Sequence, residues 1–350
     1  MHRVFNYEGV IEMTDLNPKE RLLNALNREP VDKVPVVSVT QTAIVDLMDQ
    51  TGAEWPEAHS DAEKMATLAV ASHEIAGLEA VRYPYCLTVL AEAMGCEVNM
   101  GTKNRQPSVT DHPYKDVDNL VMPDDLLSNG RIPAVLEATK IIIDKVGDKI
   151  PLVAGMEGPV TLASDLVSVK KFMKWSIKKP DDLETILDFA TDACIVYANA
   201  LADAGADVIC VPDPVASPDL LNPETFDKML KPRLARFAEG VKCPMVLHIC
   251  GNVTPILDMM ADCKFEGLSI EEKVADLKGA IKTVGDRAVI VGNVSSPFTL
   301  LSGDVEKVKA ESKDALEGGV AVLSPGCGIA PNTPVENVKA LVEARDEYIA

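Results

Sequence analysis

The 350-residue sequence is poor in aromatic side chains, which make up 4% of it, and it lacks long apolar runs. No run approaches the roughly 18 consecutive apolar residues that a membrane-spanning helix needs, so we expect no membrane association. The first residues, MHRVFNYEGVIE, contain no apolar core of the kind found in export signals, which predicts a cytoplasmic protein. Because 47% of the residues are hydrophobic, mostly aliphatic side chains must fill a sizeable core.

Basic residues are also in short supply. The chain has 34 Lys and Arg against 54 Asp and Glu, which gives a formal net charge of −20. A field of this sign repels nucleic acid and anionic membranes. It also disfavours a highly anionic substrate, unless basic residues near the site override it. We therefore expect a small-molecule or protein partner and no nucleic acid.

The eight cysteines are dispersed through a long chain that has no export signal, so the sequence does not predict a disulfide framework. Cys194 and Cys210 lie in apolar runs and are typical of buried core positions. Cys250 and Cys327 have different surroundings, because each lies beside glycine at the end of an apolar run.

Apolar runs alternate with helical patterns along the chain, and each run is typical of a buried parallel strand. These runs are residues 34–39, 78–83, 150–155, 206–211, 243–250, 265–271, 288–294 and 319–325. Eight strands alternating with helices predict an α/β protein, namely a (β/α)8 TIM barrel. An open, doubly wound sheet is the rival architecture, but it usually has fewer strands and needs no closure.

Helix ends are marked by capping residues. Asn17 and Glu20 predict a capped start for the first helix, and Gly205 predicts the end of a long helix before the fourth strand. Thr333 and Glu336 form the pattern of a capping box before the last helix.

The sequence contains no internal repeat and no low-complexity linker, which favours one catalytic domain over residues 13–350. Met13 is internal, and we expect residues 1–12 to be an N-terminal extension. The polar segment 95–130 interrupts the alternation and predicts a small insertion after the second strand, in the form of a hairpin.

Polar residues gather at the predicted carboxyl ends of the strands, where barrel enzymes hold their sites. His248 and Cys250 are two positions apart on one strand, so their side chains point to the same side. Cys327 follows the last strand, and its flanking glycines would let the backbone turn sharply. Together the three residues offer soft ligands with a fourth position open, as in a catalytic zinc site. On these residues alone, the simpler interpretation is a core histidine and two buried thiols; the joint placement of the three residues at strand ends favours the metal site.

Four stretches carry a resemblance to a known family: VLHICGN, GLSIEE, VGNVSSPFTLL and SPGCGIAPNTPVENVKAL. They resemble the uroporphyrinogen decarboxylase superfamily, and within it the zinc-dependent corrinoid methyltransferases. The sequence is most similar to the methylcobalamin:coenzyme M methyltransferases of methanogenic archaea, particularly those of the methanol pathway. The resemblance implies a TIM barrel in which His248, Cys250 and Cys327 ligate one Zn²⁺ per chain.

The two branches of this superfamily differ in the segment after the first strand. The decarboxylases carry an arginine-rich segment there, whereas this chain reads VPVVSVTQTAIVD without arginine. That absence, the net charge and the H-x-C pattern favour methyl transfer. The resemblance implies that a methyl group moves from methylcobalamin to the thiol of coenzyme M in methanogenesis from methanol. A separate corrinoid protein is expected to carry the methylcobalamin, because this chain has no D-x-H-x-x-G-type corrinoid motif.

A thiol attacks a methyl group as the thiolate, and zinc coordination deprotonates a thiol. We therefore expect the substrate thiol to take the open zinc position. Glu271 is the predicted catalytic carboxylate, which would fill that position at rest and accept the thiol proton. Asp213 is the second predicted catalytic residue, oriented to accept a hydrogen bond from His248 or to shape the pocket. Asn293 and Tyr83 are the predicted polar residues of the cofactor and substrate pocket.

Two sources of a sulfonate-binding charge remain open: Arg82, beside the end of the second strand, and the backbone amides at the start of the last helix. Other functions also remain open. One is a methylamine-pathway isoenzyme, or methyl transfer to another thiol such as homocysteine. A second is a decarboxylase without zinc. A third is a non-catalytic subunit that binds a corrinoid protein and holds a structural zinc ion.

Overall fold

The computed structural model describes residues 3–6 and 9–12, for their backbone, and residues 15–349 in full. Strands β1 (Arg3–Asn6) and β2 (Gly9–Glu12) pair with each other in antiparallel register. Met13 lies outside the described residues. The division at residue 12 therefore stays a prediction.

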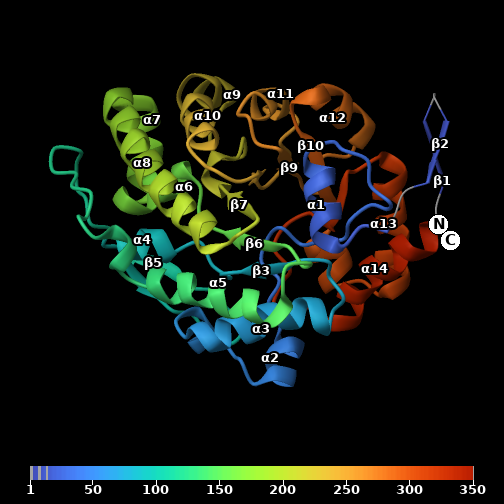
Figure 1. Cartoon of the computed structure of the whole chain (residues 1–350). Helices are drawn as coiled ribbons and strands as arrows, with labels where there is room; N and C mark the ends of the chain where they lie inside the picture. The colour runs from blue at the N-terminus through green and yellow to red at the C-terminus, as the bar shows by residue number, and fades with distance from the viewer. Residues whose placement is uncertain (1–2, 7–8, 13–14, 350) are drawn as a thin grey trace.

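Within the described residues, a parallel sheet of seven strands forms the centre of the molecule, with helices around it (Figure 1). The strands are β3 (Val81–Tyr83), β6 (Leu152–Gly155), β7 (Val208–Pro212), β8 (Met245–His248), β9 (Gly267–Ser269), β10 (Val289–Val294) and β11 (Val322–Pro325). Their order in the sheet is their order in the sequence, from β3 to β11. Each strand lies within one of the apolar runs predicted from the sequence, except that β7 extends one residue further, to Pro212.

The first of the eight predicted strands, residues 34–39, is reduced to a single parallel bridge between Val36 and Leu323 of β11. The same segment also reaches the other edge of the sheet, because the amide of Glu79, just before β3, donates to the carbonyl of Val36. The segment therefore contacts both edge strands of a curled sheet. Pro35 in VPVVSV limits its ladder, since Pro has no backbone N–H to donate.

Helices α1–α14 surround the sheet (Figure 1). Their bounds are α1 Pro18–Leu26, α2 Val45–Thr51, α3 Ala62–Glu74, α4 Val89–Ala93, α5 Ile132–Val146, α6 Pro159–Val167, α7 Val169–Lys178, α8 Pro180–Ala204, α9 Pro223–Thr225, α10 Lys231–Glu239, α11 Leu257–Ala261, α12 Leu277–Val284, α13 Val305–Gly318 and α14 Val335–Ile349. A π-helical segment, Ser296–Leu301, follows β10.

Side chains on the inner face of the sheet form their own small apolar cluster, separate from the large core between sheet and helices. Val208 and Cys210 of β7 and Val246 of β8 belong to it, at the alternate positions that a strand directs to one side. Leu22 and Leu26 of α1 join the same cluster, so α1 closes the amino end of the sheet's interior. The carboxyl end is left for polar groups.

The predicted caps were mostly right. Asn17 and Glu20 form the capping box of α1, and Gly205 ends α8 in the left-handed conformation. The box predicted at Thr333 is wrong, because the Thr333 hydroxyl has no hydrogen-bond partner among the described residues. The first amide of α14 instead donates to the carboxylate of Asp46 on α2, which binds that helix start to another helix.

The polar segment 95–130 contains a small antiparallel hairpin, as expected, formed by β4 (Glu97–Asn99) and β5 (Ser108–Asp111). It follows α4 in the chain and lies beside it (Figure 1). Residue Gln106 in its loop reaches the carboxyl end of the central sheet, as described below.

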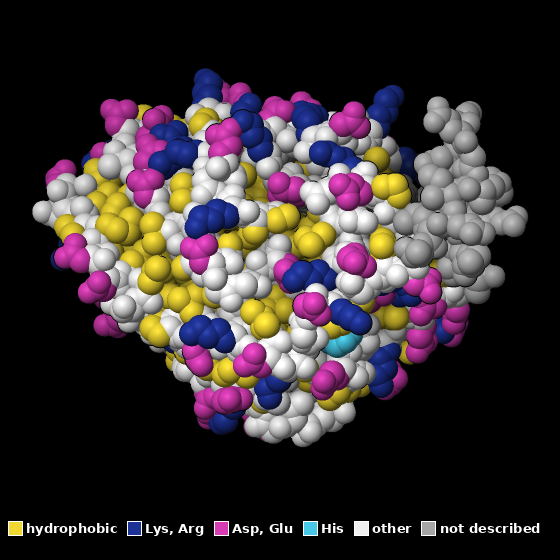
Figure 2. Space-filling model, in the orientation of Figure 1, with side chains coloured by type: hydrophobic (Ala, Val, Ile, Leu, Met, Phe, Trp, Pro, Cys, Tyr) yellow, Lys and Arg dark blue, Asp and Glu magenta, His cyan; other side chains and the backbone are white. Residues whose placement is uncertain are grey.

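Helix α8 is the one described helix whose length and composition would suit a membrane span, and half of that span is buried inside the protein. It packs against α5, α6, α7 and α10, as expected for a core helix. Figure 2 shows acidic and basic side chains intermingled on one face, with hydrophobic atoms exposed over α8 and its neighbours. Ile177 of α7 is the most exposed of the large hydrophobic side chains, at 82%.

Candidate metal centre

His248 is the last residue of β8 and is 1% exposed. Its ring lies on the inner face, two positions after Val246, as the alternation of strand side chains predicts. The Nδ1 atom lies 3.1 Å from Oγ of Ser269, which is the residue paired with His248 on the neighbouring strand β9. This contact orients the ring and directs Nε2 towards Cys250, whose Sγ is 3.4 Å away.

Cys250 lies just beyond the end of β8, and its main chain is fixed by a neighbouring loop. The Ser217 hydroxyl donates to the Cys250 carbonyl over 2.8 Å. The next residue, Gly251, has φ +92°, a left-handed conformation that turns the chain away after the cysteine. A Cβ at this position would also lie 2.5 Å from the carboxylate of Asp219, so glycine is required there.

Cys327 reaches the same place from the loop after β11. Ser296 holds this loop, because its hydroxyl donates to the Cys327 carbonyl over 2.9 Å and accepts from the Cys327 amide. The flanking glycines do not provide the sharp turn expected from the sequence, since neither has a positive φ. Gly326 provides space instead: a Cβ there would lie 3.1 Å from Cα of Glu271.

Glu271 completes the group from the segment after β9. One ligand atom from each of His248, Cys250, Glu271 and Cys327 lies within 4.8 Å of every other. The Glu271 carboxylate is nearly buried and forms an ion pair of 2.8 Å with Lys273. Two thiols, an imidazole with a fixed ring and one carboxylate are a donor set that suits zinc. The residues therefore fit this ion.

The two thiols of this group influence each other. A hydrogen bond from the Cys250 thiol to the Cys327 sulfur, together with His248, lowers the pKa of Cys327 to about 4, although burial opposes the shift. The same hydrogen bond, together with burial, raises the pKa of Cys250. One sulfur of the pair is thus stabilised as a thiolate, the form that ligates metals.

The group opens onto a cavity of about 110 Å³ at the carboxyl end of the sheet. Arg82, Tyr85 and Gln106 line this cavity together with His248, Cys250 and Cys327. Thr40 and Gln41 contribute to it from the segment that replaces the first strand. A space of this size suits a small thiol, since pockets for drug-sized ligands are typically about 300–1,000 Å³.

The carboxylate of Asp213 makes no hydrogen bond to the His248 ring, contrary to the prediction. Its carboxylate accepts the amides of Val160 and Thr161 and the Thr161 hydroxyl, so it caps the start of α6. Only its amide meets His248, by donating to the histidine carbonyl over 2.8 Å. Burial raises the pKa of Asp213 to about 6, although these hydrogen bonds oppose the shift.

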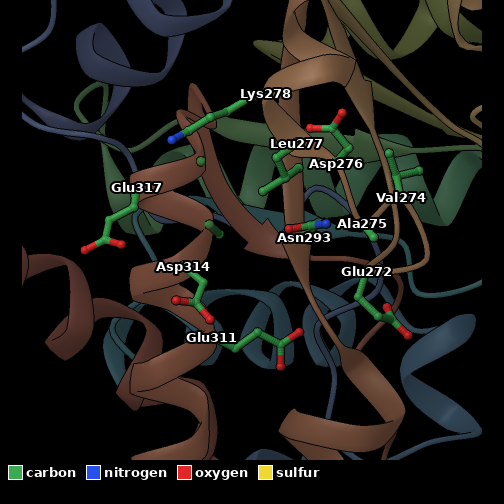
Figure 3. A pocket seen from close by; sticks show the side chains of 12 residues that line it. Glu272, Val274, Ala275, Asp276, Leu277, Lys278, Asn293, Glu311, Asp314 and Glu317 are labelled. Carbon is green, nitrogen blue, oxygen red and sulfur yellow. The ribbon is translucent and has the colours of Figure 1, made fainter.

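Tyr83 and Asn293, the predicted pocket residues, both lie outside this cavity. The Tyr83 hydroxyl is 2.7 Å from Thr139 of α5, so the ring belongs to the core between sheet and helices. Asn293 lies in a separate groove of about 480 Å³ that carboxylates of α13 also line, including Glu311 and Asp314 (Figure 3). Its amide does support the site indirectly, by donating to the Glu271 carbonyl over 3.3 Å.

Sequence reasoning missed Ser269, Thr40 and Gln106 as residues of the site. A signal for Ser269 existed, because it shares a face with Glu271 and lies one strand away from His248. Thr40 also had a signal, since it lies in the segment where the decarboxylases carry arginine. Gln106 had none, because nothing in a polar hairpin loop indicates which residue turns back towards the sheet.

Comparison with known proteins places the chain in one family. Residues 17–348 match the family described as Uroporphyrinogen decarboxylase (URO-D). The sequence is 65% identical to the Methylcobamide:CoM methyltransferase MtaA of Methanosarcina barkeri, over 97% of this chain and 100% of that protein. It is 40% identical to the Methylcobamide:CoM methyltransferase MtbA of Methanosarcina acetivorans, over 96% of this chain and 99% of that protein.

A solved structure described as a methyltransferase from Methanosarcina mazei is also similar to this chain. It superposes with a TM-score of 0.95 at 68% sequence identity, over 96% of this chain and 100% of that one. The sequence comparison and the structural comparison therefore both match almost the whole chain to methyltransferases.

Proposed function

The chain belongs to the uroporphyrinogen decarboxylase family and is a methyltransferase, and we propose that it uses zinc to move a methyl group from a methylcorrinoid to the thiol of coenzyme M. The observation that carries this proposal is the convergence of His248, Cys250, Glu271 and Cys327 within 4.8 Å beside a small cavity. The names of the relatives, which specify methylcobamide and coenzyme M, support the choice of substrates.

His248, Cys250 and Cys327 would hold one zinc ion per chain. When bound, zinc would supply a Lewis acid that keeps a substrate thiol in its thiolate form. Ser269 fixes the ring of His248, while Ser217 and Ser296 fix the two cysteine loops, so the ligands are preorganised. Glu271 is the group best placed to take the proton of an arriving thiol, and Lys273 holds its carboxylate.

The methyl donor has to approach from outside the molecule. A cavity of about 110 Å³ is far too small to bury a corrin ring, which supports a donor carried by a separate corrinoid protein that docks over the opening. The identity of 65% to the MtaA relative, against 40% to the MtbA relative, supports the methanol pathway that the family resemblance implies. We further propose a cytoplasmic location and a (β/α)8 barrel in which residues 35–37 occupy the first strand position.

The test combines metal analysis with a transfer assay from free methylcobalamin to 2-mercaptoethanesulfonate. Wild type should hold one zinc ion per chain. The variants His248→Ala and Cys327→Ala should lose at least about 100-fold in zinc affinity, more than the loss usual for an outer partner, and transfer should fall with it. Cys263→Ala removes a fully buried thiol near α11 and is the matched control. It should keep the zinc ion and the methyl-transfer activity of wild type.

Full zinc content and full activity in His248→Ala and Cys327→Ala would contradict the site. A wild type that binds no zinc and transfers no methyl group would restore the decarboxylase alternative. The pathway is tested separately, with methylated corrinoid proteins purified from methanol-grown and from methylamine-grown cells. A higher kcat/KM with the protein from methanol-grown cells is expected, and the reverse preference would assign the chain to methylamine metabolism.

A further inference from the structure

Arg82 of β3 is a buried cation that the proposed chemistry has not yet used. It is 1% exposed, and it lines the same cavity as His248, Cys250 and Cys327. The strand register directs it to the inner face, whereas its neighbour Tyr83 points outward to α5. A positive charge therefore lies beside the proposed thiol position.

The other buried arginines all have carboxylate partners, and Arg82 has none. Arg21 and Arg345 share Glu79, and Arg131 pairs with Glu92. Among the described residues, no carboxylate lies within ion-pair distance of Arg82, whose guanidinium donates only to the backbone carbonyls of Val39 and Pro84. A buried charge normally needs a counter-ion, so this cavity lacks an anion.

A second polar group in the cavity has no partner either. The hydroxyl of Thr40 is buried, and no hydrogen bond to it exists among the described residues. Thr40 lines the cavity together with Arg82. The hydroxyl and the guanidinium thus offer hydrogen-bond donors that the protein itself does not satisfy.

The protein makes room for the guanidinium at Gly155 of β6. A Cβ at that position would overlap Nη2 of Arg82, so only glycine lets the guanidinium lie there. The other cations and donors near the site are already used. Lys273 pairs with Glu271, and the first amide of α14 is bound by Asp46.

We infer that Arg82 and Thr40 bind the anionic end of the thiol substrate, which for coenzyme M is its sulfonate. This inference rests on the proposed function for the identity of the thiol. The negatively charged protein thereby offers one local positive charge to a small anion. A sulfonate two carbons from its thiol fits a small cavity in which the sulfur lies at the cysteine side and the oxygens lie at Arg82.

The kinetic test compares three thiols as acceptors: 2-mercaptoethanesulfonate, 3-mercaptopropionate and the neutral 2-mercaptoethanol. In Arg82→Gln, the ratio of kcat/KM for the sulfonate to that for the neutral thiol should fall by about 30-fold or more, mainly through KM. Arg82→Lys should lose less, because it keeps the charge without the planar fork. Good transfer to 3-mercaptopropionate would identify the group bound as any compact oxyanion rather than a sulfonate alone.

A binding test avoids activity altogether. Ethanesulfonate, which has no thiol, should raise the melting temperature of metal-free wild type by mass action and should leave that of Arg82→Gln unchanged. Gly155→Ala keeps the arginine but displaces it, and it should lose the same protection. Arg345→Gln changes an equally buried arginine that is paired with Glu79, and it should keep the protection and the selectivity.

Equal selectivity for the sulfonate in wild type, Arg82→Gln and Gly155→Ala would overturn the inference. So would unchanged protection by ethanesulfonate in both variants. The failure of the proposed function has a different result: wild type would transfer no methyl group to any thiol, while ethanesulfonate would still protect the wild type and not Arg82→Gln. That outcome would support the anion site and reject the methyl transfer.

Discussion

Polar side chains lie at the carboxyl ends of two sets of strands: β8, β9 and β11 form one set, and β6 and β7 form the other. The two sets differ in what their polar side chains contact. After β8, β9 and β11, the side chains of His248, Glu271 and Cys327 face one another beside a cavity. After β6 and β7, the carboxylates of Glu157 and Asp213 accept backbone amides of α4 and α6. The first group is available to a ligand, whereas the second is used by the fold.

The carboxylate of Asp213, after β7, is bound by the fold for a local reason. Gly158 is the N-cap residue of α6 and has no side chain to accept the first amides of the helix. A Cβ there would collide with the Asp213 carboxyl, so the cap comes from the neighbouring strand instead. A polar residue at a strand end therefore indicates a site only where no nearby helix start needs its hydrogen bonds.

The largest expected effect comes from replacing one sulfur ligand in the group of His248, Cys250, Glu271 and Cys327. Cys250→Ser replaces a thiolate ligand with a hydroxyl, so zinc affinity should fall at least about 100-fold and methyl transfer should fall with it. Cys210→Ser is the matched control, because Cys210 lies on the same inner face but outside the group of four ligands. Zinc titration and the methylcobalamin assay measure both. Equal zinc loss in the two variants would mean that any inner-face thiol matters, not this group.

The next effect concerns the second group. Asp213→Ala removes a buried acceptor of three hydrogen bonds, which should lower the free energy of unfolding by about 2–4 kcal/mol. Zinc content should stay at the wild-type level. Asp213→Asn keeps one acceptor oxygen and should cost less. Urea unfolding beside metal analysis checks this prediction, and zinc loss in Asp213→Ala without unfolding would return Asp213 to the metal site.

Much of the fold followed from apolar runs and caps. Seven runs became strands, because a buried parallel strand reads as a continuous apolar segment. Residues 34–39 did not, since Pro35 has no N–H to donate and the short contact at Val36 leaves only a bridge. The Thr333 cap failed for a tertiary reason: Asp46, far away in the sequence, binds the start of α14.

Only those residues of the site that strand alternation brings to one face could be predicted from the sequence. His248 and Cys250 could be placed together because they are two positions apart. Tyr83 was predicted as a pocket residue and lies outside the cavity, whereas Arg82, which stayed open as a sulfonate-binding charge, lines it, because neighbouring residues of a strand point to opposite faces. Gln106 could not be placed, since it reaches the cavity through a hairpin whose path no local pattern encodes.

The smallest expected effect is a pH dependence of the free energy of unfolding, which comes from Glu157 after β6. Glu157 is fully buried, one of its carboxylate oxygens has no partner among the described residues, and burial raises its pKa from 4.5 to about 7. The folded state therefore binds this proton more tightly than the unfolded state, so its contribution to stability is present below pH 4.5 and is lost as pH rises through 7. Between pH 5 and pH 8 the loss should be on the order of 2 kcal/mol.

Glu157→Gln keeps an acceptor for the amide of Ala91 but cannot ionise, so it should remove this loss. Its free energy of unfolding should exceed that of wild type at pH 8, and the difference should shrink as the pH is lowered to 5. Asp213, with a pKa raised to about 6, contributes in the same direction and remains in both proteins. Because the charge of Glu157 also raises the pKa of Asp213, the difference measures Glu157 together with its effect on Asp213. Urea unfolding across this range measures it. A constant difference from pH 5 to pH 8 would mean that Glu157 is already ionised in the folded protein, and that the carboxylates after β6 and β7 are held as charges rather than as buried neutral groups.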